Sequence, residues 1–306
     1  MNHLHTFSIV ARDPNNGYLG VAVQTHWFGV GALCPWVEAG VGAIATQSMV
    51  ERSYGPCGLD LLREGKTAGE TLEELLSRDD QHELRQVAMV DLLGNVATHT
   101  GKRCIEEAGH IIGNQYSVQA NMMKNASVWP AMAEAFEKKS GDLADRMLAA
   151  LNAAQSVGGD IRGKQSAAML VADGEKSKMP WEHIIFNLRV DDHPEPLNEL
   201  ERLIKVERAY RLMNEGDELL SKHEIEAAMQ HYSAAEQHAP HTLEIPFWQA
   251  VTLADMGQME KALPIFSRVF KQNPDWAELV QRLPKAGLLR SDPDMMKKIL
   301  EVMNNE

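Results

Sequence analysis

The chain has 306 residues, a length that accommodates one large domain with a smaller one, or two domains of medium size. Hydrophobic residues make up 44% and charged residues 24%, the proportions of an ordinary globular protein, which excludes the fibrous and disorder-dominated classes. The formal net charge is −13 and the lysines and arginines are dispersed, so we expect no nucleic-acid partner and no membrane surface, because both require clustered cations.

The cysteines and the first residues indicate the compartment. Cys34, Cys57 and Cys104 are the three cysteines and show no CxxC spacing, which is typical of free thiols in a reducing compartment. The sequence begins with no charged and then apolar leader, and no apolar run approaches the roughly 18 residues of a membrane-spanning helix. We therefore expect a cytoplasmic protein.

The first part of the chain alternates short apolar runs with glycine-containing turns. Thr6–Arg12 and residues 18–25 flank a turn that contains Pro14 and Gly17, which predicts a β-hairpin. Further strands are predicted at 40–47, 86–91, 96–100, 116–119, 165–173 and 183–190.

Helices are predicted between these strands, at 58–64, 67–77, 127–138 and 142–155. Thr67 and Glu70, three positions later, form a capping-box pattern, and Asp142 stands at an N-cap position. Strands grouped around pairs of helices, rather than alternating with them, favour an α+β fold whose sheet is largely antiparallel.

Helical periodicity dominates after residue 191 and contains a repeat with a period of about 34 residues, the period of tetratricopeptide repeats. The positions typical of such a repeat are occupied by Gly216, Ala228, Tyr232, Ala235 and Pro240, and again by Ala250, Ala262, Phe266, Val269 and Pro274. We predict two helix-turn-helix units with a capping pair at 276–301; a generic pair of helical hairpins is the alternative. The predicted organisation is one domain at 1–190, a linker at 191–196 and helical repeats at 197–306.

Thr6 is the first candidate for chemistry. A threonine at the start of a buried strand can use its own α-amino group as the base that activates its hydroxyl, provided that the residues before it are removed. The alternative is that Thr6 only begins a strand, which threonine favours in any case.

Other candidate groups carry weaker signals. The glycine-rich segment 158–168 contains Asp160 and Arg162, which can orient a substrate or pair with each other; a structural connector is the alternative. The 12 histidines lack metal-ligand spacing, so no metal site is predicted. No GxSxG motif is present, and Cys34 and Cys57 stand beside prolines and are interpreted as small buried hydrophobic residues.

Several blocks of sequence together resemble one family. Residues 6–24, 35–47, 54–62, 85–91, 117–122 and 158–168 are similar, in order, to the bacterial and archaeal domain of unknown function 1028. That family is similar in fold to the N-terminal-nucleophile hydrolases, and some members carry an extra C-terminal domain. The resemblance implies an α+β, four-layer αββα sandwich of N-terminal-nucleophile hydrolase type, followed here by the all-α helical-repeat domain.

The resemblance also implies an activity and a site. Family members usually begin Met-Thr-Phe-Ser, which makes Thr6 the candidate catalytic nucleophile. Here Asn2-His3-Leu4-His5 intervene, so exposure of its amine requires cleavage of the His5–Thr6 bond. The proteasome-like branch places a lysine beside the threonine. No lysine precedes Lys66, so Arg12 or Arg162 would take that role, or no residue would. The implied pocket residues are Arg12, Gln24, Thr46, Gln47, Gln119, Asn121, Asp160 and Arg162.

Three functional hypotheses follow. The first is a hydrolase of amide or peptide bonds with an N-terminal threonine nucleophile, no cofactor, a small amide or peptide substrate and a homo-oligomeric assembly. The second is an inactive protein of the same fold that binds a protein partner through residues 197–306. The third is metal-dependent hydrolysis through Asp and His side chains.

Overall fold

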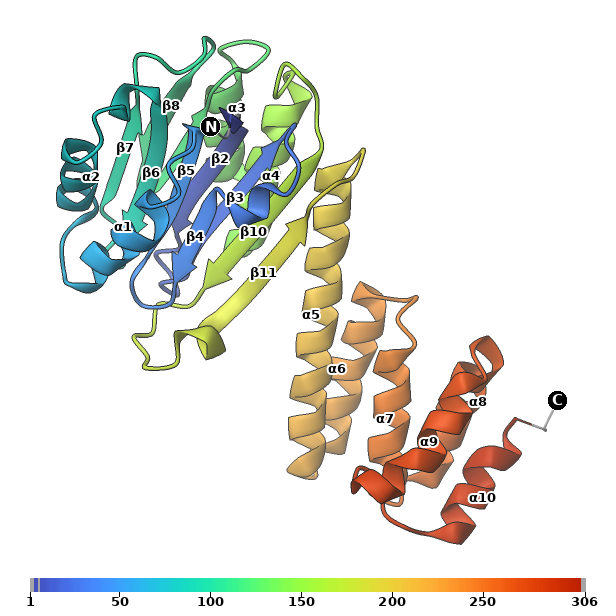
Figure 1. The fold of residues 1–306 in the computed structure, drawn as a ribbon. Coiled ribbons are helices and arrows are strands. Elements are labelled where there is room, and N and C mark those ends of the chain that lie inside the picture. The colour runs from blue at the N-terminus through green and yellow to red at the C-terminus, as the bar shows by residue number, and fades with distance from the viewer. Residues whose placement is uncertain (1–2, 5, 304–306) are drawn as a thin grey trace. The chain divides into compact units, whose positions relative to one another are not determined.

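The computed structural model describes residues 3–4 and 6–303, with side chains from residue 6 onward. The chain divides into two compact units, Met1–Ile204 and Lys205–Glu306, which are described separately. Figure 1 shows the order of their elements along the chain. No helix among the described residues is long and apolar enough to cross a membrane.

The first unit contains two sheets, and every strand pair in them is antiparallel. The first sheet has five strands in the order β1-β5-β6-β7, and β4 also pairs with β5. Its strands are β1 (His3–Leu4), β4 (Pro35–Glu38), β5 (Gly42–Met49), β6 (Arg85–Asp91) and β7 (Val96–Thr100). The second has six strands in the order β11-β10-β3-β2-β9-β8. These are β2 (Thr6–Arg12), β3 (Leu19–Thr25), β8 (Gly109–Gly113), β9 (Tyr116–Ala120), β10 (Ser166–Ala172) and β11 (Ile184–Val190).

Each sheet packs a pair of helices on one face and the other sheet on its opposite face. Helices α1 (Tyr54–Arg63) and α2 (Ala68–Ser77) share a core with Ile44 of β5. Helices α3 (Val128–Lys138) and α4 (Leu143–Ser156) share a core with Phe7 and Ile9 of β2. Val10 of β2 and Ala45 of β5 belong instead to the core between the sheets. Because side chains alternate between the two faces of a strand, these buried strands each contribute to two cores.

The 3₁₀ turns of this unit are η1 (Val30–Ala32), η2 (His82–Leu84) and η3 (Pro180–His183). The capping box at α2 is confirmed, since the Glu70 N–H donates to Thr67 Oγ1 and the Thr67 N–H to Glu70 Oε2, at 3.3 and 2.8 Å. The N-cap at α4 is also confirmed, because Asp142 Oδ1 accepts from the Asp145 N–H.

The predicted α+β class, with two antiparallel sheets and an all-helical C-terminal region, is confirmed at that level. The short strands β4 and β8 are not predicted by the sequence. Strand β4 begins with Pro35, and β8 begins and ends with glycine. Such segments become strands by pairing with a longer neighbour, and local sequence carries little of that information. Helix α1 also begins at Tyr54, earlier than the predicted residue 58.

The second unit is entirely helical in its described residues. Its helices are α5 (Pro196–Ser221), which begins in the first unit, then α6 (Ile225–His238), α7 (Glu244–Asp255), α8 (Met259–Gln272), α9 (Asp275–Ala286) and α10 (Pro293–Glu301). Both ends of α8 are those of α6 shifted by one period of the sequence repeat. Tyr232 and Phe266, which occupy the same repeat position, are both fully buried. A Cβ at Gly216 would lie 3.0 Å from the Tyr232 ring, so a small residue is needed for this approach.

Candidate functional site

Thr6 is the residue at which the chain enters the second sheet. Strand β1 pairs with β5 in the first sheet, and β2 begins in the second sheet at Thr6, so a single residue separates the two strands. Thr6 is fully buried. Its carbonyl oxygen accepts hydrogen bonds from the Asn121 N–H and from Gln47 Nε2, both at 3.1 Å. Its Oγ1 has no hydrogen-bond partner among the described residues.

The Thr6 hydroxyl lies on the face of β2 that looks toward the first sheet. Phe7 and Ile9 point to the helices, so Thr6 and Ser8 point the other way by the alternation of a strand. This orientation agrees with the contact of Ser8, whose Oγ donates across the interface between the sheets to Gln47 Oε1 at 2.6 Å. Thr6 therefore stands at the end of the interface between the two sheets.

A set of buried amides fixes the position of the Thr6 carbonyl. Gln86 Oε1 accepts from Gln47 Nε2 at 2.7 Å and from Asn121 Nδ2 at 2.9 Å. Gln86 Nε2 in turn donates to Thr100 Oγ1 and to the Ala120 carbonyl, both at 2.9 Å. We call Gln47, Gln86 and Asn121 the amide cluster. Because each amide is fully buried and bonded to another, none can turn without breaking several hydrogen bonds.

A second branch of hydrogen bonds extends from the amide cluster along β9. Gln119 Nε2 donates to Ser8 Oγ at 2.6 Å, and Ser117 Oγ donates to Gln119 Oε1 at 3.1 Å. Thr98 Oγ1 then donates to Ser117 Oγ at 2.8 Å. The interface between the sheets is therefore polar near Thr6. The rest of the core between the sheets is apolar and consists mainly of valine and alanine.

Two residues beside the amide cluster have unusual backbone conformations. Ser48 follows Gln47 and has φ 70°, and Met122 follows Asn121 and has φ 57°. Non-glycine residues in this region cost about 1–3 kcal/mol, and such strain gathers at functional sites. Both strained positions follow directly after a residue that donates to the Thr6 carbonyl.

Arg162 is the predicted cation that the structure brings toward Thr6. Thr25 is the cross-strand partner of Thr6, and Arg162 Nη2 donates to Thr25 Oγ1 at 3.4 Å. The guanidinium also forms an ion pair with the buried Asp160, from Nη2 to Oδ2 at 2.7 Å. Asp160 Oδ2 additionally accepts from the His26 N–H, so the glycine-rich loop that carries this pair is tied to the end of β3.

Of the predicted pocket residues, Gln47 and Asn121 contact Thr6 itself. Gln119 contacts Ser8 two positions along β2, and Asp160 and Arg162 contact the end of β3 at His26 and Thr25. The other three lie elsewhere. Arg12 is at the other end of β2, about 20 Å along the strand, where it donates to Gln115. Gln24 is paired with Phe7 and so faces the helices, and Thr46 Oγ1 donates to the Glu51 carbonyl. Strand length and alternation separate all three from the Thr6 hydroxyl.

Ser8, Gln86 and Ser117 also belong to this hydrogen-bonded region, and none of them was among the predicted site residues. The signal that was present is a polar residue inside an otherwise apolar strand, as in Thr6–Arg12 and Arg85–Asp91. It does not say which polar residues meet, because the partners are far apart in the chain: Ser8 and Gln119 are separated by 111 positions.

The cysteines offer no competing nucleophile at this place. Cys34 is fully buried, and burial raises its pKa far above the usual value for a thiol. Burial also raises the pKa of Cys104. A thiol that stays protonated is a poor nucleophile. The interpretation of Cys57 as a buried residue was wrong, because Cys57 is exposed on α1, where it lines a pocket elsewhere in the unit.

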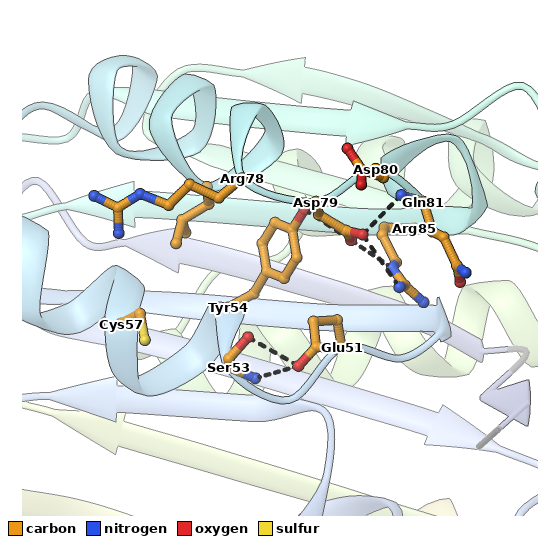
Figure 2. Close-up of a pocket in the computed structure, with 10 residues that line it drawn as sticks. Glu51, Ser53, Tyr54, Cys57, Arg78, Asp79, Asp80, Gln81 and Arg85 are labelled. Carbon is orange, nitrogen blue, oxygen red and sulfur yellow. Dashed lines mark hydrogen bonds and ion pairs between the residues drawn. The ribbon is translucent and has the colours of Figure 1, made fainter.

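That pocket has a volume of about 550 Å³ and contains none of the predicted site residues. Figure 2 shows Tyr54 pointing from α1 toward Asp79, which forms an ion pair with Arg85 at 2.7 Å. The residues that line the pocket are Glu51, Ser53, Tyr54, Cys57, Leu75, Arg78, Asp79, Asp80, Gln81 and Arg85. Burial and the Asp79 carboxylate raise the pKa of Tyr54, which keeps its hydroxyl protonated. A hydrogen bond from Arg85 Nη1 to the Met49 carbonyl, at 2.7 Å, connects the pocket to the end of β5.

The histidines and acidic residues do not gather into a metal site where the structure describes them. Within residues 6–303, no group of three or more His, Cys, Asp or Glu side chains is arranged to hold a metal ion.

Comparison with known proteins places the chain in a family. Residues 6–200 match the model of the family of unknown function DUF1028. The chain belongs to the DUF1028 family. It is similar to the DUF1028 protein SPO2555 from Silicibacter pomeroyi, with 33% identity and a TM-score of 0.59. The similarity to that crystal structure covers 65% of this chain and 87% of the other. No curated protein matches the chain.

Proposed function

We propose that the first unit is a hydrolase of amide or peptide bonds whose nucleophile is Thr6, released as an N-terminal residue by cleavage of the His5–Thr6 bond. The observation that carries the proposal is the contrast within Thr6: its carbonyl is held by two residues, while its buried Oγ1 is bonded to none of the described groups. Buried hydroxyls are normally hydrogen-bonded, so an unpartnered one at the start of a strand suits a nucleophile.

The layered arrangement supports the same assignment. We take the two antiparallel sheets, each with helices on its outer face, to be the four-layer αββα sandwich of N-terminal-nucleophile hydrolases. Thr6 begins β2, and the neighbouring Ser8 side chain bonds across the interface to Gln47, which supports a role for Thr6 as the nucleophile of that fold.

The reaction would proceed in two steps. The free α-amine of Thr6 takes the proton of Oγ1 while Oγ1 attacks the substrate carbonyl carbon; the C–N bond breaks, and the leaving nitrogen receives that proton. Water then hydrolyses the ester on Oγ1, which restores the hydroxyl and releases the acid. Within the uncleaved chain the Thr6 nitrogen is an amide, so water has to carry the proton. Oγ1 gives its proton to water and attacks the carbonyl carbon of residue 5, the C–N bond breaks, and the nitrogen takes a proton from water to become the free amine. Water then hydrolyses the ester on Oγ1 and releases residues 1–5, so the chain can process itself.

Arg162 would take the place of a basic residue beside the nucleophile. A positive charge near an amine favours its neutral form, and only the neutral amine can act as a base. The Asp160 carboxylate moderates this effect, and it also fixes the guanidinium beside Thr25.

The proposal is tested by the intact mass of protein made by cell-free synthesis, where other proteases are few. Wild-type protein should lose the residues before Thr6 on incubation, Thr6→Ser should do so at a measurable rate, and Thr6→Ala should keep its full mass. The loss of rate in Thr6→Ala should be at least about a thousandfold. Thr46→Ala is the matched control, because Thr46 is a buried strand threonine whose hydroxyl bonds elsewhere.

Two results would contradict the proposal. One is a wild-type chain that stays full-length as long as Thr6→Ala does. The other is a Thr6→Ala chain that is processed at the wild-type rate, which would assign the cleavage to another enzyme.

The helical region supports a second candidate function, the binding of a protein partner. A groove of about 460 Å³ lies on α6, α7 and α8, and Gln249 lines it. The Gln249 side-chain oxygen is buried and has no hydrogen-bond partner among the described residues. We regard α6–α8 as tetratricopeptide-like repeats that present this groove. Capture of a specific partner by residues 197–306, lost in Gln249→Leu, tests the assignment.

A further inference from the structure

Strand β1 occupies an edge of the first sheet that no other described strand covers. In antiparallel register, His3 is opposite Met49 and Leu4 is opposite Ser48 of β5. Strand β4 covers the same edge of β5 only at Gly42–Ala45, and β6 covers the other edge. The Ser48–Met49 edge would therefore be open if the residues before Thr6 were gone.

If Thr6 cleaves the bond that precedes it, β1 is part of the acyl group in that reaction. In that reaction the acyl group transferred to Oγ1 is the chain upstream of the cleaved bond, which includes His3 and Leu4. A substrate whose carbonyl is attacked from the same side must place its own acyl chain along the same path. The segment upstream of Thr6 is thus the first acyl group that the site holds.

We infer that the Ser48–Met49 edge of β5 binds the acyl side of a peptide substrate as an added antiparallel strand, in the place that β1 occupies before cleavage. This inference rests on the proposed function and names its substrate class: a peptide in extended conformation with at least three residues before the cleaved bond. A free sheet edge offers main-chain hydrogen bonds to any extended peptide, and side-chain contacts then set the preference.

The edge is held in position by groups that do not belong to β1. The Met49 carbonyl accepts from Arg85 Nη1 at 2.7 Å, and Arg85 is itself fixed by Asp79. Ser48 keeps φ 70° while buried, directly after Gln47 of the amide cluster. The adjacent residues Gln47 and Ser48 therefore connect the carbonyl of Thr6 with the strand edge.

The test uses a chain that begins at residue 6 and carries Thr6→Ala, so that binding is measured without catalysis. The probes are a fluorescent peptide with the sequence of residues 1–5 and two versions of it, N-methylated at position 3 or at position 4. In an antiparallel pair, neighbouring residues alternate in directing their N–H toward the partner strand. One N-methyl group should weaken binding about tenfold and the other less than about threefold, as measured by fluorescence anisotropy.

A second measurement on the full-length Thr6→Ala chain covers the case in which the shortened chain does not fold. Either His3→Pro or Leu4→Pro, but not both, should speed amide exchange at residues 48–49 by about tenfold, since proline removes one ladder hydrogen bond. Equal affinities for the three peptides, or no binding up to about 1 mM together with unchanged exchange in both proline variants, would overturn the inference.

The outcomes separate the two proposals. If Thr6→Ala is processed like wild type while only one of the two N-methylated peptides binds more weakly, the peptide site at the β5 edge is supported and the nucleophile assignment fails. If processing depends on Thr6 but the peptides do not differ, the nucleophile stands and the edge is not the acyl site.

Discussion

At the scale of single residues, the site is defined by which polar atoms are bonded and which are not. Gln47 and Asn121 both donate to the Thr6 carbonyl, and Gln86 accepts from both of them. An unpaired buried polar atom costs about 1–3 kcal/mol, so these three amides stabilise the fold only as a set. The Thr6 hydroxyl does not belong to the set, since it is bonded to none of the described residues.

Replacement of Gln86 should show how strongly the amide cluster depends on its central member. Gln86→Leu leaves Gln47 Nε2 and Asn121 Nδ2 without their shared acceptor, and we expect a loss of about 2–4 kcal/mol in the free energy of unfolding. Urea denaturation of the variant and the wild type measures it. Gln81→Leu, at an exposed position close in sequence, should change stability by less than about 0.5 kcal/mol. Equal stability of the two variants would show that the cluster is not cooperative.

At the scale of elements, two helix glycines differ in whether close packing against the sheet requires them. Helix α1 approaches the ring of Trp36 on β4 so closely that a Cβ on Gly55 would lie 2.3 Å from it. On α2, a Cβ on Gly69 would meet nothing nearer than 4.0 Å. Packing therefore requires a glycine at position 55 but not at position 69, although both residues lie in helices that cover the first sheet.

Alanine substitutions at these two positions should move stability in opposite directions. Gly55→Ala forces Trp36 or α1 to shift, and we expect a loss of about 1–3 kcal/mol. Gly69→Ala meets no obstacle and removes the entropic cost of glycine in a helix, so we expect a gain of up to about 1 kcal/mol. Thermal unfolding of both variants beside the wild type checks the sign, and a stabilising Gly55→Ala would show that Trp36 moves freely.

At the scale of the whole molecule, the chain forms two units, and the core of the first continues beyond its last strand. Leu197, Leu200 and Ile204 of α5 belong to the core that α3, α4 and the second sheet share. The domain boundary predicted at residue 190 stays a prediction, and these buried side chains provide a way to examine it.

Two truncated chains separate the possible ends of the first unit. A chain that ends at residue 204 keeps Leu197, Leu200 and Ile204, and a chain that ends at residue 190 lacks them. Each buried aliphatic side chain contributes about 1.5–3 kcal/mol, so the shorter chain should be less stable by at least about 4 kcal/mol. Urea denaturation of both chains measures the difference. Coincident unfolding curves would place the end of the unit at residue 190.

The sequence by itself determined the α+β class, the hairpin that begins at Thr6, the cap residues Thr67 and Asp142, and the helical C-terminal region. These features depend on local periodicity and on groups a few positions apart, which the sequence displays directly. It also indicated Thr6, Gln47, Gln119, Asn121, Asp160 and Arg162 as candidates. Only the tertiary structure decided that two of these contact Thr6 while Arg12, Gln24 and Thr46 lie elsewhere, because strand register and face alternation set which residues meet. It also showed that β1 covers the edge of β5, a pairing between segments far apart in the chain that no local pattern encodes.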